Sequence, residues 1–337
     1  MTVLVTGATG FVGGHLVERL AKEKERIKCL VKRGSDTSLL EKAGAELIYG
    51  DLLDKASLKA AVAGVDTVYH LAALARLYTG LTAEDYNKVN AEGTRNLLEA
   101  CAGKVVHIVY TSSADAVGPS RDGRPCDEST PRRPVNIYGE SKLASELICE
   151  EYSKKGVPIT VIRPPMIYGP RCMLHLKRLF KLVKTGFYPV MGDGQALMEF
   201  CYVGNVVAGL ILAARSKQAI GRTYYISDER SYTITEVLNA IAKAEGVKLR
   251  IIHLPTPVGN AIGLTVETFG KVFRFWPFIV KETGRPTFSR NTVRWSTGNT
   301  WICSTEKAKR ELGYEPAVSL QEGVQRTVEW YKSVGAL

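Results

Sequence analysis

The sequence predicts an α/β fold, in which a doubly wound parallel sheet is followed by a smaller C-terminal α/β lobe. Short apolar runs alternate with helical segments through the first half of the chain. Strands this short and this apolar are typical of a parallel sheet covered by helices on both faces. The predicted strands are 3–6, 27–31, 46–49, 67–70, 105–111 and 159–162, and the predicted helices are 11–22, 57–62, 83–101 and 137–153.

The pattern changes after Pro164-Pro165. Glycine and proline then punctuate shorter helices and isolated strands, as in Gly192-Asp193-Gly194 and Pro255-Thr256-Pro257. We therefore predict a first domain over residues 1–165 and a C-terminal lobe over residues 166–337, with some elements of the lobe returning to the first domain. An amphipathic helix over 320–332 is expected to pack on the body of the protein.

The composition is that of a globular protein: of 337 residues, 45% are hydrophobic and 23% are charged. The longest apolar stretch, 206–214, is much shorter than the roughly 18–20 residues of a spanning helix. No secretory signal is visible, so a cytoplasmic location is expected. The seven cysteines are scattered and no cluster has metal-ligand spacing, which predicts reduced thiols and no metal.

The net charge of +11 points to an acidic partner or to a solvated basic surface. The excess cations are not interleaved with aromatic residues, which argues against nucleic acid as the partner. An anionic cofactor phosphate or a membrane surface fits better.

A glycine-rich loop separates the first predicted strand from the first helix, with glycines at every third position. Glycine permits a tight turn and lets backbone N–H groups approach a pyrophosphate. The following helix directs its N-terminal partial positive charge at the phosphates. Because the loop opens the first β–α unit, it predicts a dinucleotide-binding Rossmann domain. The expected contacts come from Gly7, Thr9, Gly10, Phe11, Val12 and Gly13.

The end of the second predicted strand bears on the choice of dinucleotide. An acid there would bind the adenosine ribose hydroxyl, whereas a base would accept a 2′-phosphate. The chain has Lys32 and Arg33, and no acid before Asp36. NADP(H) is therefore favoured, although NAD(H) remains possible and the two cations could simply be solvated.

Tyr138 and Lys142 are four residues apart near the start of a predicted helix, which places both on one face. A nearby ammonium stabilises a phenolate and is expected to lower the tyrosine pKa towards the working pH. The tyrosine can then give a proton to a ketone or take one from an alcohol. By itself this spacing is frequent by chance, and a solvated helix face would be the better interpretation.

Together with the glycine loop, this stretch resembles the extended short-chain dehydrogenase/reductase family, the NAD-dependent epimerase/dehydratase group. The resemblance covers nearly the whole chain and rests on several motifs in family order. Besides the glycine loop and Tyr138/Lys142, they are Gly50-Asp51-Leu52, His70-Leu71-Ala72-Ala73, Asn90 before Gly93-Thr94, Thr111-Ser112-Ser113 and the run 163–170.

The resemblance implies an NAD(P)-dependent oxidoreductase with a catalytic triad of Ser113, Tyr138 and Lys142. Ser113 would bind the reacting oxygen, Tyr138 would be the acid/base, and Lys142 would hold the nicotinamide ribose and tune Tyr138. Further cofactor contacts are implied for Asp51, Leu52, Ala72, Ala73, Pro165 and Ile167. Each also has a local structural explanation, and Asn90 could be structural as readily as catalytic.

Two features of the C-terminal half bear on the substrate. Nucleotide-sugar epimerases typically carry an arginine after the Gly-Asp-Gly loop, where this chain has Met198, which cannot grip a diphosphate. The run 200–209 is similar to the 3β-hydroxysteroid dehydrogenase and sterol-4α-carboxylate 3-dehydrogenase branch, as is Arg285-Pro286-Thr287-Phe288. Ser113, Tyr168 and Met198 are the expected substrate contacts.

The segment 257–281 is apolar, aromatic and basic. Such a helix can lie in a membrane interface or line the entrance for a hydrophobic substrate, or it can pack in the core with a charged outer face. Relatives pair through helices corresponding to 83–101 and 137–153, so the resemblance also implies a homodimer.

The leading prediction is an enzyme that interconverts a hydroxyl and a ketone on a hydrophobic, sterol- or isoprenoid-like substrate. A nucleotide-sugar 4-epimerase or dehydratase of the same family is the alternative. A non-enzymatic dinucleotide-binding subunit is disfavoured because such relatives tend to lose the tyrosine or the lysine, and this chain has both.

Overall fold

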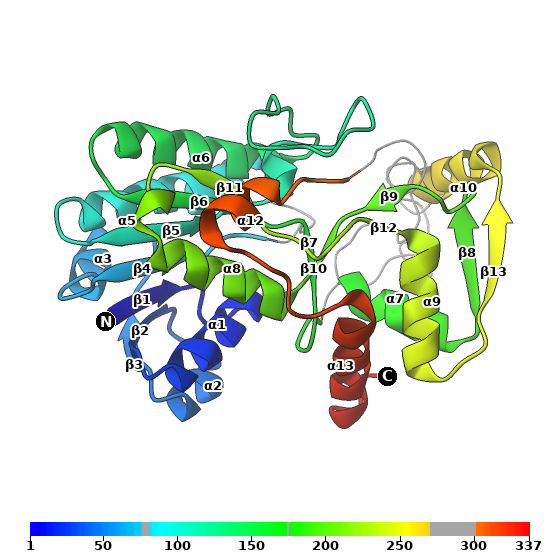
Figure 1. Cartoon of the computed structure of the whole chain (residues 1–337), viewed down its shortest axis with the longest axis horizontal. Coiled ribbons are helices and arrows are strands. Elements are labelled where there is room, and N and C mark those ends of the chain that lie inside the picture. Colours follow the sequence, from blue (N-terminus) through cyan, green and yellow to red (C-terminus); the bar gives the residue numbers. More distant parts are fainter. Residues whose placement is uncertain (76–80, 174, 270–300) are drawn as a thin grey trace.

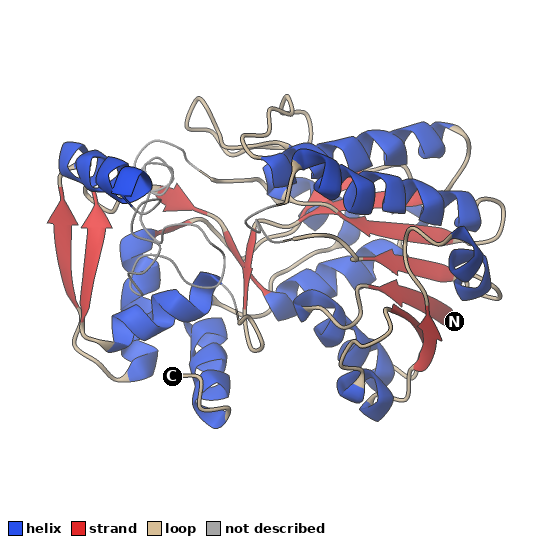
Figure 2. Cartoon of the chain, turned by 180° about the vertical axis from the view of Figure 1, so that it is seen from behind, coloured by secondary structure: helices blue, strands red, loops and turns tan. Residues whose placement is uncertain are grey.

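The computed structural model describes residues 1–75, 81–173, 175–269 and 301–337. Its centre is a seven-stranded parallel sheet in the order β11-β6-β5-β4-β1-β2-β3 (Figures 1 and 2). The strands are β1 (Thr2–Thr6), β2 (Arg26–Val31), β3 (Glu46–Tyr49), β4 (Thr67–His70), β5 (His107–Thr111), β6 (Ile159–Arg163) and β11 (Thr223–Tyr225). The predicted doubly wound fold is confirmed, and each of its six predicted strands is present.

Helices cover both faces of the sheet, as Figure 1 shows. One layer contains α1 (Phe11–Lys22), α2 (Ser38–Lys42), α8 (Val203–Arg215) and α12 (Glu306–Leu312), and the other contains α3 (Lys55–Ala61), α5 (Gly93–Cys101) and α6 (Ile137–Lys154). Each layer packs its own apolar core against the sheet, so the strands are buried from both sides.

The predicted helix over 83–101 is divided in the structure. It consists of α4 (Ala83–Asn87), a π-helical turn (Lys88–Glu92) and α5. π-Helical turns often occur at functional sites, because the extra residue turns side chains toward new directions. Here the turn carries Asn90, whose contacts are described below.

The C-terminal lobe holds three small two-stranded sheets: β7 (Met166–Tyr168) with β10 (Phe200–Tyr202), β8 (Phe187–Met191) with β13 (Arg250–Leu254), and β9 (Leu197–Met198) with β12 (Tyr232–Thr233). Its helices are α7 (His175–Lys184), α9 (Ile234–Glu245), α10 (Thr256–Phe269) and α13 (Leu320–Ser333). The predicted last helix, α13, packs on α9. In contrast, β11 belongs to the large sheet, and α8 and α12 pack against it. The predicted division of the chain at residue 165 stays a prediction.

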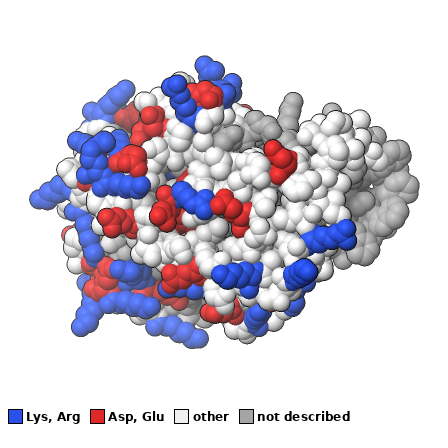
Figure 3. All heavy atoms as spheres, turned by 45° about the vertical axis from the view of Figure 1, so that its right-hand side comes forward, with Lys and Arg blue, Asp and Glu red and all other residues white. Residues whose placement is uncertain are grey.

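Charges of both signs share the face drawn in Figure 3, where lysines and arginines lie among aspartates and glutamates over much of the surface. All seven cysteines are buried, and none forms a disulfide. In the described part of the chain, no helix is long and apolar enough to cross a membrane. Over the same residues, no group of three metal-binding side chains comes together.

Candidate active site

The carboxyl ends of the central strands meet at one edge of the sheet. Thr6 pairs in register with His70 of β4, and His70 pairs with Tyr110 of β5. The loops that follow β1, β4 and β5 therefore leave the sheet side by side, and this is where open parallel sheets bind ligands. Every predicted cofactor loop begins at this edge.

The glycine loop forms the predicted turn into α1. Gly7 has a left-handed backbone, with φ +72°, and its carbonyl accepts from the Gly10 N–H at 3.0 Å. A Cβ on Gly13 would lie 2.1 Å from the Gly7 carbonyl oxygen, so only glycine allows the helix to approach the turn. Gly10 is the N-cap of α1 and has no capping side chain, which leaves first-turn N–H groups available for a phosphate.

This packing predicts a clear difference between two neighbouring glycines. Gly13→Ala is expected to abolish measurable dinucleotide binding, because its Cβ would displace the turn that presents the N–H groups. Gly14→Ala is the matched control, since its Cβ would meet nothing closer than 3.7 Å. Calorimetric titration of both variants, after thermal unfolding has shown that each is folded, tests the prediction. Equal binding by the two variants would contradict it.

The two cations after β2 differ in their contacts. The Lys32 ammonium forms a 2.7 Å ion pair with Asp51, whereas the Arg33 guanidinium lies over the Tyr49 ring, 5.6 Å from its centroid. Burial of Asp51 opposes its charge, but the hydrogen bond and charge of Lys32, together with the Leu53 N–H, outweigh burial and lower the carboxyl pKa. Leu52 is buried with its side chain against Gly93. Among the described residues, Lys32 thus pairs with an acid, whereas Arg33 does not.

The loop after β4 is held against the glycine turn. The Ala72 N–H donates to Thr6 Oγ1 at 3.3 Å, and a Cβ on Gly7 would lie 2.7 Å from the Ala72 nitrogen. Ala73, next in the chain, is half-buried. Asn90 braces the same loop: its Oδ1 accepts from the Leu74 N–H at 2.7 Å, and its Nδ2 donates to Ser141 Oγ at 2.9 Å. Asn90 therefore links this loop to the helix that carries Tyr138 and Lys142.

Lys142 is anchored at the end of β5. Its Nζ donates to the Thr111 carbonyl oxygen at 2.7 Å and lies 4.5 Å from the centroid of the Tyr110 ring. The side chain is almost completely buried, and this burial lowers its pKa to about 8. Lys142 is therefore held beside the segment that leads to Ser113, while its roles towards the nicotinamide ribose and Tyr138 stay predictions.

Asp115 interacts with both Ser113 and Tyr138, through hydrogen bonds with the first and through its charge with the second. Ser113 Oγ donates to Asp115 Oδ2 at 3.1 Å, and it accepts from the Asp115 backbone N–H at the same distance. The pKa of the Tyr138 phenol is raised, first by burial and then by the Asp115 carboxylate, while a hydrogen bond with Ser113 acts in the opposite direction. The protein environment thus raises the pKa of Tyr138, contrary to the expected lowering, because burial and the Asp115 carboxylate both disfavour the phenolate.

The remaining predicted residues follow β6 or lie in the C-terminal lobe. The Ala114 N–H donates to the Pro164 carbonyl at 3.0 Å, which joins the serine turn to the link between β6 and β7 that contains Pro165 and leads to Ile167. Tyr168 is buried in the core of the C-terminal lobe, and its hydroxyl donates to Asp228 at 3.1 Å. Met198 is half-buried in β9 against that core. The structure thus places Tyr168 in the core of the lobe, and the substrate contacts of both residues stay predictions.

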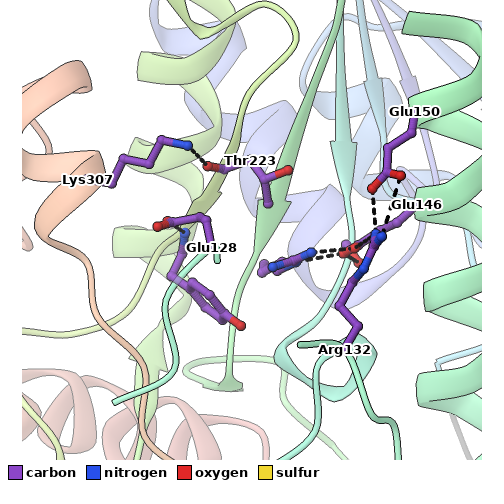
Figure 4. Close-up of polar contacts among 9 residues, drawn as sticks. Glu128, Arg132, Glu146, Glu150, Thr223 and Lys307 are labelled. Atoms are coloured by element: carbon purple, nitrogen blue, oxygen red, sulfur yellow. Dashed lines mark hydrogen bonds and ion pairs between the residues drawn. The ribbon is translucent and has the colours of Figure 1, made fainter. Parts of the chain in front are cut away.

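A buried ion pair between Glu146 and Arg163, which no sequence pattern indicated, lies next to the site. Glu146 accepts from Arg163 Nη2 at 2.6 Å and Nε at 2.9 Å, and from Ser112 Oγ at 2.5 Å. Arg132 reaches both Glu146 and the exposed Glu150, as Figure 4 shows. Burial opposes the charge of Arg163, but the bonds and charge of Glu146 outweigh it and raise the arginine pKa.

Glu146 therefore ties together three segments of the site. Ser112 precedes Ser113, Arg163 precedes the Pro164-Pro165 pair, and Glu146 itself lies one turn after Lys142 on α6. No local sequence pattern predicts such a role for a single glutamate in a helix, so this role of Glu146 follows only from the three-dimensional structure.

Fold and site together define a Rossmann-type enzyme with a serine, a tyrosine and a lysine at the carboxyl edge of its sheet. Comparison with known proteins leads to the same class of enzyme. The NAD dependent epimerase/dehydratase family matches residues 3–227. The chain belongs to this family of extended short-chain dehydrogenases/reductases.

Relatives are similar over almost the whole chain. The 4-hydroxy-2-methyl-3-oxo-4-farnesyl-3,4-dihydroquinoline-1-oxide ketoreductase of Stigmatella aurantiaca is 27% identical, covering 96% of this chain and 95% of that protein. Short-chain dehydrogenase/reductase family 42E member 1 of Danio rerio is 28% identical, covering 98% and 88%. The crystal structure of gox2253 superposes with a TM-score of 0.82 at 29% identity, covering 100% and 99%.

Proposed function

We propose that this oxidoreductase interconverts a hydroxyl group and a ketone on a hydrophobic, sterol- or isoprenoid-like substrate. The observation that carries the proposal is the convergence of Ser113, Tyr138 and Lys142 where β5 ends and α6 begins. Met198 supports a substrate without a diphosphate, because a thioether cannot replace an arginine fork. The name of the Stigmatella relative, a ketoreductase with a farnesyl-bearing substrate, supports it further.

In this proposal, the side chains of Ser113, Tyr138 and Lys142 carry out the proton transfer. Ser113 binds the reacting oxygen, and Tyr138 donates a proton to a ketone or removes one from an alcohol. Lys142 binds the nicotinamide ribose beside the Thr111 carbonyl, which holds its ammonium in place. The bound nicotinamide supplies or accepts the hydride. The protein keeps Tyr138 as a neutral acid, which suits ketone reduction, whereas the positive charge of an oxidised nicotinamide favours the phenolate needed for alcohol oxidation.

We further propose that NADP(H) is the preferred cofactor and that Arg33 is the main phosphate contact. Arg33→Ala is expected to weaken NADP(H) binding about tenfold or more, the value of one charge-assisted hydrogen bond, while NAD(H) binding stays unchanged. Lys32→Ala is the comparison, with a smaller expected loss because Lys32 already pairs with Asp51. Titrations of each variant with both dinucleotides measure the preference. An equal loss for NADP(H) and NAD(H) in Arg33→Ala would refute the assignment.

The assembly we propose is a cytoplasmic homodimer that contacts a membrane surface peripherally through the segment 257–281. Of this segment, residues 270–281 lie outside the described residues, as does the run 285–288. In the described part, α10 exposes Val258 and Leu264. Exposed apolar side chains on a helix next to a basic segment suit the interface of an anionic membrane, from which a hydrophobic substrate can be drawn.

A substrate panel tests the proposed reaction. The purified enzyme is incubated with NADPH or NADH and steroid or isoprenoid ketones, and with the oxidised cofactors and the matching alcohols, while the nicotinamide absorbance is followed. We expect net cofactor turnover with members of this panel. Interconversion of UDP-sugars without net cofactor change, and inertness towards the panel, would favour the nucleotide-sugar 4-epimerase alternative.

A further inference from the structure

Asp115 is an acid in direct contact with Ser113 of the triad, and no local sequence pattern marks it. It lies in a short 3₁₀ turn (Ala114–Ala116) for which Ser113 is the N-cap. One carboxylate oxygen, Oδ2, accepts from Ser113 Oγ at 3.1 Å, and the other, Oδ1, accepts from Asn136 Nδ2 at 2.8 Å. The two oxygens therefore have different partners.

Asn136 fixes which oxygen of Asp115 can carry a proton. The Asn136 Oδ1 atom is the N-cap acceptor of α6 and receives the Gly139 N–H at 2.7 Å, so the amide cannot turn over. Its Nδ2 must therefore donate to Asp115 Oδ1, which has to remain an acceptor. A proton added to the carboxyl group is consequently placed on Oδ2, the oxygen that faces Ser113.

The hydrogen bonds of Ser113 then depend on the charge of Asp115. A serine hydroxyl has one proton and two lone pairs, and the Asp115 backbone N–H occupies one lone pair in either state. Beside the carboxylate, the serine proton is directed at Oδ2, and the remaining lone pair can accept from the Tyr138 hydroxyl or from a substrate alcohol that takes its place. Beside the carboxylic acid, Oδ2–H fills that lone pair, and the serine proton is free to donate to a ketone oxygen.

We propose that Asp115 is a positioning residue that sets the hydrogen-bond direction of Ser113, so that the carboxylate favours binding of an alcohol and the carboxylic acid favours binding of a ketone. The proposal rests on the proposed function, because it assumes that Ser113 meets the reacting oxygen.

The surroundings of Asp115 favour its neutral form more than water does. Burial raises the pKa of its carboxyl group, and the bonds from Asn136 and Ser113 only partly offset this. The titratable group that faces it from α6 is Tyr138, whose pKa the carboxylate raises in turn. Within the described ranges, no lysine or arginine forms an ion pair with Asp115, and the Lys142 ammonium is bound to the Thr111 carbonyl.

Asp115→Asn tests the proposal because the variant imitates one charge state permanently. Asn136 holds the new carbonyl oxygen, so the new NH₂ group faces Ser113 and donates to it, as the carboxylic acid would. The probes are a saturated 3-ketosteroid and its 3β-alcohol, each at saturating cofactor across a range of pH. In the wild type, we expect the KM for the ketone to rise and the KM for the alcohol to fall as the pH increases through the Asp115 titration. In Asp115→Asn, the KM for the alcohol should be about tenfold higher than in the wild type at high pH. The ratio of the ketone KM to the alcohol KM should no longer depend on pH.

Asp122→Asn is the matched control, since this exposed acid bonds only within its own loop and should leave both KM profiles unchanged. A pH-dependent KM ratio that persists in Asp115→Asn would overturn the proposal, because the amide cannot titrate and the dependence would then come from another group.

A second measurement needs no substrate. The Asp115 carboxyl group is titrated by ¹³C NMR, with its signal assigned by its loss in Asp115→Asn. Ser113→Ala removes a donor to the carboxylate, so the Asp115 midpoint should rise; an unchanged midpoint would overturn the proposal. If neither steroid reacts but the midpoint responds to Ser113→Ala, the proposed function fails while the coupling of the two residues stands.

Discussion

Tyr138→Phe is expected to lower turnover by about 10²- to 10⁴-fold, the usual value of a positioned general acid or base. The hydroxyl is the group that would pass the proton to or from the reacting oxygen, and the phenyl ring that remains keeps the packing at the start of α6. Dinucleotide affinity should therefore stay within about twofold of the wild type. Steady-state kinetics and calorimetric titration of the same preparation measure the two quantities.

The chain offers a matched control on the same helix. Tyr152 of α6 donates its hydroxyl to Glu99 at 3.2 Å, remote from the carboxyl edge of the sheet. Tyr152→Phe removes the same atom without touching the triad and should retain wild-type turnover. Should Tyr138→Phe keep more than a tenth of the activity, Tyr138 is not the acid/base.

Glu146→Gln is expected to cost about 3–5 kcal/mol of the free energy of unfolding, as measured when a buried ion pair loses one partner. Both Glu146 and Arg163 are almost completely buried, at 2% and 4% side-chain exposure. The neutral amide would leave the Arg163 guanidinium as an uncompensated charge in the core, and its NH₂ group would face another donor. Urea unfolding at equilibrium gives the change directly.

Glu150→Gln is the control for this loss of charge. Glu150 lies one turn further along α6 and pairs with Arg132, but its side chain is 48% exposed. Exposed pairs contribute about 0–1 kcal/mol, so the unfolding midpoint should scarcely move. Equal destabilisation by Glu146→Gln and Glu150→Gln would show that Glu146 is not the link between the segments of the site.

The local patterns of the chain were sufficient for six of the seven strands of the sheet and for the helix of the triad. The glycine loop and the four-residue spacing of Tyr138 and Lys142 are short-range features, and the structure reproduces the geometry that each requires. Strand β11 was not predicted, because it is a three-residue piece that joins the sheet only through its pairing with β6. Helix α2, with only five residues, had too little periodicity to stand out.

The supporting contacts of the site could not be predicted, since they join residues far apart in sequence. Glu146 meets Arg163 across 17 residues and Ser112 across 34, and no spacing rule relates them. The direction of the Lys142 ammonium is likewise decided by the position of the Thr111 carbonyl at the end of β5. Tyr168 follows a predicted cofactor residue, Ile167, but successive strand residues face opposite sides, and Tyr168 turns into the core of the lobe.

The most direct test of the central claim follows a deuterium atom. The enzyme is supplied with NADPH, or with NADH, labelled at the transferable C4 position, together with a steroid or isoprenoid ketone from the panel, and the products are examined by mass spectrometry and NMR. We predict an alcohol with one deuterium at the carbinol carbon for each cofactor oxidised, and loss of this product in Tyr138→Phe. An enzyme that leaves every such ketone unlabelled, yet interconverts UDP-sugars while its cofactor remains unchanged overall, would contradict the assignment.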